Sequence, residues 1–256
     1  MTLALLTAAC GAADGESPES PSGEAMLQIR SEGGFAPVEL ILGAGPRYTL
    51  LDDGRLIFEG VQIAIFPGPL LPPYQVARLD ANQMDAVAEI VDRIGLPQIT
   101  QEHDDSAAGR VADASTEVIT YWDENGEHEL SVYALGIEPT PSERNRAFLE
   151  LVETFDRFVG SADAEPYEPE QVRIISGPGV IDQDFQDIRP WPLDDDWNAW
   201  TELGNGWTCR VFGPDVLEQF GEATQVTVWE IPDVFSYSAP AKLLVRPLHP
   251  GETSCP

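Results

Sequence analysis

From Met26 onward, short hydrophobic segments separated by turn residues predict a series of β-strands. The segment 26–31 alternates apolar and polar residues and has the length of a strand. The apolar runs 38–43, 48–52, 55–58 and 61–66 also have strand length. Asp53 and Gly54 lie between two of these runs, where a tight hairpin needs residues that accept a positive φ. The prolines of 66–75 exclude a central strand, so we expect a rigid surface loop, with a polyproline ligand for a partner as the alternative.

Helical periodicity follows in 80–97. Asp80 is placed to cap the helix, and Gln83, three residues later, has the spacing of a capping box. Gly95 and Pro97 are residues that end helices. The apolar stripe that would face the core is formed by Met84, Val87, Val91 and Ile94.

An acidic loop is expected over 101–113, and a second hairpin after it. Its strands, 115–122 and 127–135, flank an Asn125-Gly126 pair that favours a two-residue turn. Because both strands contain β-branched and aromatic residues, we expect them to pair with each other in the sheet.

A second helix is predicted over 140–160. Thr140 and Glu143 have capping-box spacing, Pro141 would occupy the first helical position, and Gly160 would end the helix. Its buried face would be formed by Phe148, Leu151, Val152, Phe155 and Phe158.

Together these patterns predict an α+β fold in two units. Residues 26–162 are expected to form an antiparallel sheet of hairpins with both helices on one face. A linker, 163–170, leads to a smaller βαββ unit, 171–256, in which 177–206 is irregular. Its regular elements are strands at 171–176, 208–212, 225–231 and 241–248 and a helix at 214–223.

Acidic side chains dominate the charge of the chain. There are 44 Asp and Glu residues against 14 Lys and Arg residues, for a formal net charge of -30. This charge repels nucleic-acid phosphates and anionic lipid surfaces alike, and it excludes nucleic acid as a partner. We interpret the negative charge as a solvated acidic surface that keeps the protein soluble; the alternative is a surface dedicated to binding cations.

The cysteine count predicts one disulfide. Cys10 lies beside the apolar N-terminal run, which leaves Cys209 and Cys255 to pair with each other and implies an oxidising compartment. The alternative is a cytosolic protein in which both are free thiols. A 209–255 bridge would close a long loop, so it would also stabilise the fold by restricting the unfolded chain.

The N-terminal segment LLTAAC, residues 5–10, resembles the end of a bacterial lipoprotein signal peptide. The resemblance implies that 1–9 is a signal segment and that Cys10 carries the lipid. Residues 10–25 are rich in Gly, Ala, Ser, Pro and Glu and are expected to form a disordered tether. The alternatives are a cleaved secretory signal and an uncleaved soluble start.

Known catalytic motifs are absent from the sequence, and no cofactor is expected. There is no Gly-x-Ser-x-Gly elbow, no phosphate-binding loop and no His-Glu-x-x-His. The three histidines, His103, His128 and His249, lack the spacing of metal ligands and are expected at the surface.

Two residue groups remain as candidate binding sites. Asp182, Asp184 and Asp187 could offer oxygen ligands to calcium, although their spacing lacks the glycine and the closing glutamate of a calcium loop. Four tryptophans could stack on a sugar or a partner peptide, or could fold inward as a small core. They are Trp191, Trp197, Trp200 and Trp207.

Several motifs together resemble a group of secreted actinobacterial lipoproteins with no assigned activity. In order they are GGF at 33–35, DGR at 53–55, IFPGPLLP at 65–72, VADA at 111–114 and RPLHPGETSC at 246–255. The resemblance implies a lipid anchor on the outer face of the cell membrane and a C-terminal disulfide. We therefore expect a non-enzymatic binding or envelope-interaction module whose partner is an envelope protein or polysaccharide. The alternatives are a cell-wall or extracellular hydrolase and a protein inhibitor of one.

Overall fold

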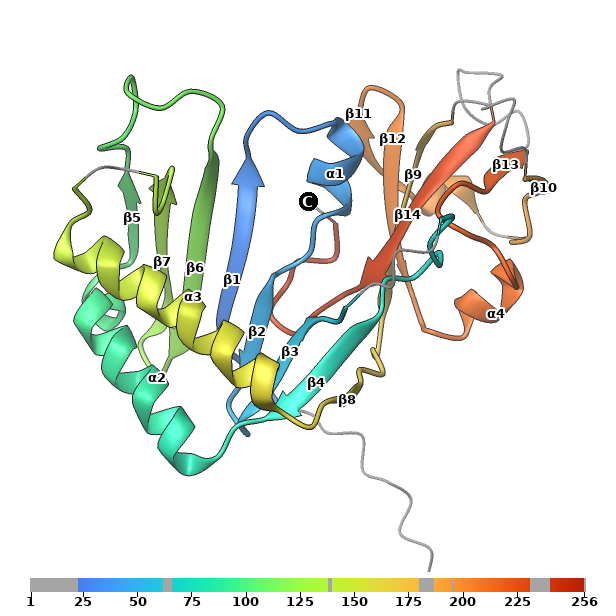
Figure 1. Ribbon diagram of the computed structural model, residues 1–256. Coiled ribbons are helices and arrows are strands. Elements are labelled where there is room, and N and C mark those ends of the chain that lie inside the picture. The colour runs from blue at the N-terminus through green and yellow to red at the C-terminus, as the bar shows by residue number, and fades with distance from the viewer. Residues whose placement is uncertain are drawn as a thin grey trace, which may run out of the picture.

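The structure, a computed structural model, describes residues 23–61, 66–137, 140–179, 187–194, 196–230 and 240–255. These residues form an α+β fold with two mixed β-sheets, and helices cover one face of the larger sheet (Figure 1). The predicted fold class is thus confirmed. In the described ranges, every helix is too short or too polar to cross a membrane.

The larger sheet joins strands from distant parts of the chain around β1. In spatial order its strands are β5 (Gln101–Asp104), β7 (Gly126–Tyr133), β6 (Ser115–Asp123), β1 (Ala25–Gly33), β2 (Tyr48–Leu51), β3 (Arg55–Glu59), β4 (Tyr74–Arg78) and β8 (Glu165–Pro166). Neighbouring strands are antiparallel except β5 and β7, which are parallel. The sheet is therefore mixed, and β5 forms where the sequence predicted an acidic loop.

Both predicted hairpins are present. Gly54 has a φ of 85° in the turn between β2 and β3, and Gly126 has a φ of 123° where β7 begins. These are backbone conformations that glycine adopts at little cost. The expected strand at 61–66 falls mostly outside the described residues.

Helices α2 (Ala81–Ile94) and α3 (Glu143–Ser161) lie side by side on the same face of the larger sheet (Figure 1). The start of α2 is as predicted, because the Asp80 side chain accepts from the Gln83 amide and the Gln83 side chain accepts from the Asp80 amide. Gly95 ends it in the left-handed region. The core beneath includes Leu27, Ile29, Leu50, Val87, Phe148, Leu151 and Phe155.

The predicted start of α3 is wrong by two residues. Ser142, not Thr140, is the N-cap, and its side chain accepts a hydrogen bond from the Asn145 amide at 3.1 Å. The Asn145 side chain in turn donates to Asp104 of β5 at 2.9 Å. Ser and Thr can both cap a helix, and this contact with β5 favours Ser142 over Thr140. The sequence did not predict β5.

The predicted strand at 38–43 is instead a short helix, α1 (Val38–Gly43). Both edges of β1 are already paired, one with β2 and the other with β6, so no sheet edge is free beside this segment. Pro37 precedes the helix, and its carbonyl accepts from the Leu40 and Ile41 amides. None of the α1 residues is buried.

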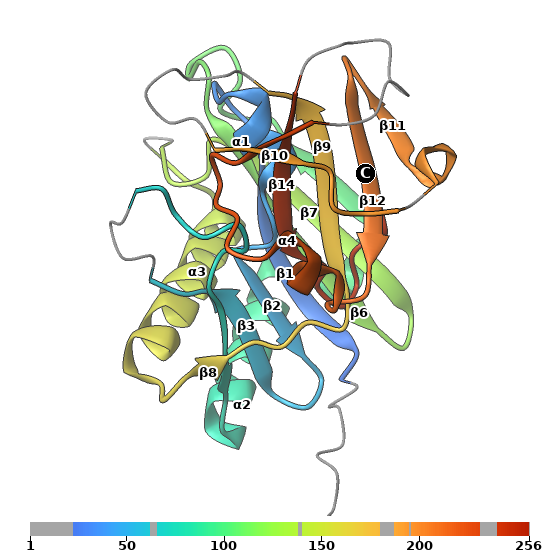
Figure 2. The same ribbon diagram turned by 90° about the vertical axis from the view of Figure 1, so that its right-hand side faces the viewer.

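The second sheet contains the regular elements predicted after residue 170, but the expectation that 177–206 is irregular is wrong, because this range supplies two further strands. In spatial order its strands are β10 (Ile188–Pro190), β13 (Val228–Glu230), β14 (Ala241–Pro247), β9 (Val172–Pro178), β12 (Trp207–Phe212) and β11 (Thr201–Gly204). A short helix, α4 (Val216–Phe220), packs on its core, and β10 runs parallel to β13. Figure 2 shows β9, β12 and β14 in front of the larger sheet.

The two sheets contact each other through segments that the sequence assigned to loops. Leu70 and Leu71 of the proline-rich 66–75 segment pack against the core of the second sheet, and the Gly68 carbonyl accepts from the Gln225 amide at 3.1 Å. The expectation that this segment is only a surface loop is therefore wrong, because leucines within it are half-buried. The predicted disulfide between Cys209 and Cys255 is present.

Candidate functional site

A cavity of about 710 Å³ lies between α1 and the face of the larger sheet that the long helices leave uncovered. One wall consists of β1 and the β6–β7 hairpin, with Arg30, Thr120 and Glu129 among its residues. The opposite wall is α1 and the loop after it, and the floor contains Arg173, Arg246 and part of the 248–255 segment. We call this cavity the α1 cleft and the 248–255 segment the tail.

The alternation of β1 makes the sheet wall polar. Leu27 and Ile29 face the helices, so the residues between and after them face the cleft. Arg30 donates to Glu32 at 2.7 Å, to Glu129 at 2.8 Å and to Thr120 at 2.8 Å. This wall thus presents an arginine held between two carboxylates.

The α1 wall is apolar and exposed. Leu40 and Ile41 line the cleft, and 66% of Leu40 and 43% of Ile41 are accessible to solvent. Phe35, in the turn before α1, is 91% exposed. Helix α1 packs on β14 without burying any of these side chains. Exposed apolar side chains that gather beside a cavity, as Leu40 and Ile41 do, mark interaction sites on soluble proteins.

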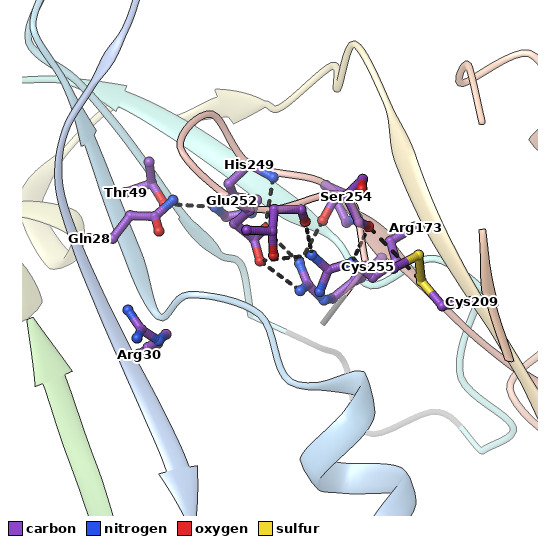
Figure 3. Close-up of polar contacts among 12 residues, drawn as sticks. Gln28, Arg30, Thr49, Arg173, Cys209, His249, Glu252, Ser254 and Cys255 are labelled. Carbon is purple, nitrogen blue, oxygen red and sulfur yellow. Dashed lines mark hydrogen bonds and ion pairs between the residues drawn. A yellow bond between two sulfur atoms is a disulfide. The ribbon is translucent and has the colours of Figure 1, made fainter. Parts of the chain in front are cut away.

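The tail fixes the floor of the cleft by contacts with both sheets. The Gln28 side chain of β1 donates to the Pro250 carbonyl at 2.7 Å, and Thr49 of β2 bonds to His249 Nδ1 at 2.8 Å. The rings of Tyr74 and Tyr167 pack edge-on against the His249 ring. Figure 3 shows the tail residues between Thr49 and Gln28 on one side and Arg173 on the other.

Glu252 of the tail bonds to a buried arginine of the second sheet. Its two carboxylate oxygens each accept from Arg246 at 2.7 Å, and one of them lies 3.6 Å from Arg173 Nη2 (Figure 3). Burial would raise the pKa of Glu252, but the hydrogen bonds and charge of Arg246 outweigh it and hold this pKa below its ordinary value. Burial, together with the Arg246 charge, lowers the pKa of Arg173 to about 10. Glu252 and Arg173 are therefore both charged at neutral pH.

His249 is neutral at the floor of the site. Burial lowers its pKa to about 4. The charge of Glu252 raises this pKa in part, whereas the charges of Arg246 and Arg173 lower it further. Thr49 and His249 are both buried, so their hydrogen bond joins the tail to the sheet and is not placed to meet a substrate. The predicted surface position is wrong for His249 and His128, whose side chains are buried, whereas His103 is exposed.

The tryptophans that the sequence singled out lie mostly within the core. Trp200 is buried and half-buried Trp191 packs against it, with ring centroids 6.0 Å apart. Trp207 is buried beside Cys209 in a separate cluster. Trp197 belongs to a short 3-10 helix, Trp197–Ala199. We therefore place no ligand surface on the Trp200 and Trp207 rings.

The aspartates proposed for calcium are only partly described. Asp182 and Asp184 lie outside the described residues, whereas Asp187 accepts from Arg189 at 2.8 Å and from Thr227 at 2.6 Å. Among the described residues, no three acidic, histidine or cysteine side chains are grouped to hold a metal ion. Cys10, the expected lipid attachment site, also lies outside the described residues.

Sequence reasoning missed Arg173, Arg246 and Glu252, although one signal was available. Each arginine adjoins an apolar run within its strand, RII in β9 and LLVR in β14. A charge at such a position needs a buried partner, and Glu252 is an acidic residue near the end of the second strand. The contact between Arg173 and Glu252 could not be read from residue spacing, because the two residues are far apart in the sequence.

The α1 cleft is suited to non-covalent binding, since it combines an apolar wall, a charged wall and a fixed floor. Its volume lies within the usual range of about 300 to 1,000 Å³ for ligand sites. The buried pair Arg246 and Glu252 holds the floor in shape and leaves the upper walls open to a partner. No protein-family model, curated protein or solved structure matches the chain.

Proposed function

We propose that the chain is a non-enzymatic binding module that engages a protein of the cell envelope through the α1 cleft, with an envelope polysaccharide as the alternative partner. The exposed apolar wall of α1 beside a cavity of about 710 Å³ carries this proposal. Exposed leucine and isoleucine cost solubility, and a partner that covers them regains the free energy of their burial.

A photo-crosslinking experiment on intact cells tests the use of this cleft. Benzoylphenylalanine replaces Leu40 in one variant and Val61 in the other; Val61 is more accessible than Leu40, 91% against 66%, but does not line the cleft. We expect irradiation to give one discrete adduct at position 40 and none at position 61. Equal labelling at both positions, or none at position 40, would contradict the proposed site.

We further propose that the module is extracytoplasmic and anchored to the outer face of the cell membrane by a lipid on Cys10. The LLTAAC segment and the Cys209–Cys255 disulfide support this location, because disulfides persist in oxidising compartments. An acidic chain gains no attraction to anionic lipids, so stable attachment needs several acyl chains at one point.

Cys10→Ser is expected to move the protein from the detergent phase to the aqueous phase when cells are extracted with a detergent that separates on warming. The variant removes the only thiol to which the proposed lipid could be attached and leaves the disulfide pair in place. Cys209→Ala with Cys255→Ala is the matched control and should stay in the detergent phase. Partitioning that survives Cys10→Ser would end the lipoprotein proposal.

A further inference from the structure

Exposed apolar side chains lie at and beside the mouth of the α1 cleft. Phe35, Val38, Leu40 and Ile41 are all exposed and lie in one stretch of the chain, and the last two line the cavity. A partner that enters the cavity can therefore contact the apolar side chains of Leu40 and Ile41. This surface requires apolar groups on the partner.

The charges at the mouth of the same cleft are acidic. Glu32 and Glu127 are exposed and line the cavity opposite α1. Its arginines are engaged inside the chain, because Arg30 lies between Glu32 and Glu129 and Arg246 is bonded to Glu252. The whole chain adds a net charge of -30. Basic groups on the partner would meet carboxylates both at the cleft and in the surrounding field.

We infer that the α1 cleft binds a cationic amphipathic segment of a partner protein. The apolar side of this segment packs on Leu40 and Ile41, and its Lys or Arg residues lie beside Glu127 and Glu32, where Glu32 shares its carboxylate between the partner and Arg30. Recognition of this kind uses apolar anchors for affinity and charge for orientation and rate. The inference rests on the proposed function and specifies the chemistry of its partner.

Two other occupants of the surface are disfavoured by charge. An anionic lipid surface and a second copy of this chain both bring negative charge to the acidic mouth.

A fluorescence anisotropy titration tests the inference. The probe is a labelled peptide of leucine and lysine at helical spacing, and the protein is the full chain carrying Cys10→Ser. Leu40→Ser combined with Glu32→Gln should weaken binding about tenfold, through loss of one apolar contact and one charge pair. The matched control, Val61→Ser with Glu89→Gln, removes an exposed apolar group and an exposed carboxylate elsewhere and should change the affinity less than twofold.

The comparison separates site-specific binding from general attraction to an acidic protein. Both double variants change the net charge equally, so an equal loss of affinity in the two would overturn the inference. The matching peptide of leucine and glutamate and vesicles of phosphatidylglycerol are tested in the same way. If either binds in a manner that depends on Leu40 and Glu32, the inference is also overturned. Self-association that depends on these residues would overturn it too. If position 40 gives a discrete adduct in cells but the leucine and lysine peptide does not bind, the cationic class of partner is rejected and the proposed function is retained.

Discussion

Glu252→Ala is expected to lower the free energy of unfolding by about 3 to 5 kcal/mol, the usual cost of removing one partner from a buried ion pair. The substitution leaves Arg246 and Arg173 buried without their carboxylate, since their side chains are only 5% and 6% exposed. It also removes the acceptor of the His249 amide, bonded at 2.9 Å. Urea denaturation at neutral pH measures the change.

An exposed ion pair of the same length provides the control. Glu150 of α3 accepts from Arg93 of α2 at 2.7 Å, with about half of each side chain exposed to solvent. Glu150→Ala should cost less than about 1 kcal/mol, because water and salt screen the pair and alanine favours the helix. If Glu252→Ala costs no more than Glu150→Ala, Glu252 is not the charge that stabilises the two arginines.

Cys209→Ala with Cys255→Ala is expected to lower the free energy of unfolding by about 4 kcal/mol. The bond joins residues separated by 46 positions, and the chain-entropy model gives this value for a closed loop of that length. Loss of the bond also frees the end of the tail, whose Thr253 and Ser254 carbonyls accept from Arg173. Urea denaturation of the wild-type protein with and without a reductant measures the same effect.

The disulfide and Glu252 act on one segment, so their effects should not add. Once the tail is released, Glu252 no longer meets Arg246, and adding Glu252→Ala to the alanine pair should cost clearly less than it does alone. Full additivity would show that the tail stays in place without the bond. The reduced wild type should match the alanine pair, and a stable reduced protein would contradict the assigned role of the disulfide.

Regular elements with local signals were predictable from the sequence. Helix α2 is specified by its own residues, namely the Asp80 and Gln83 caps, an apolar stripe and Gly95, and it forms where these signals lie. The same holds for the two hairpins with glycine turns. The disulfide was also predictable, because three cysteines and one N-terminal exception leave a single pair.

Elements and contacts that depend on distant neighbours were not predictable. The apolar run 38–43 has strand composition, yet β2 and β6 occupy both edges of β1 and the run becomes α1. Strand β5 is polar and is held by pairing with β7. The cleft needs the tail, α1 and the larger sheet to meet in space, so no short motif could indicate it. His249 resembles a surface loop residue until the sheet covers it.

Strand β1 gives the proposed anchor and the α1 cleft a mechanical connection. With a lipid on Cys10 and a partner on α1, a pulling force between cell membrane and partner enters at Ala25 and leaves beyond Gly33, along the length of the strand. Both points lie on one extended strand, so the covalent backbone of β1 carries the force, and the hydrogen bonds to β2 and β6 on its two sides are not pulled open one by one. With the proposed anchor and partner both in place, the larger sheet would therefore stay intact while the partner is held under tension.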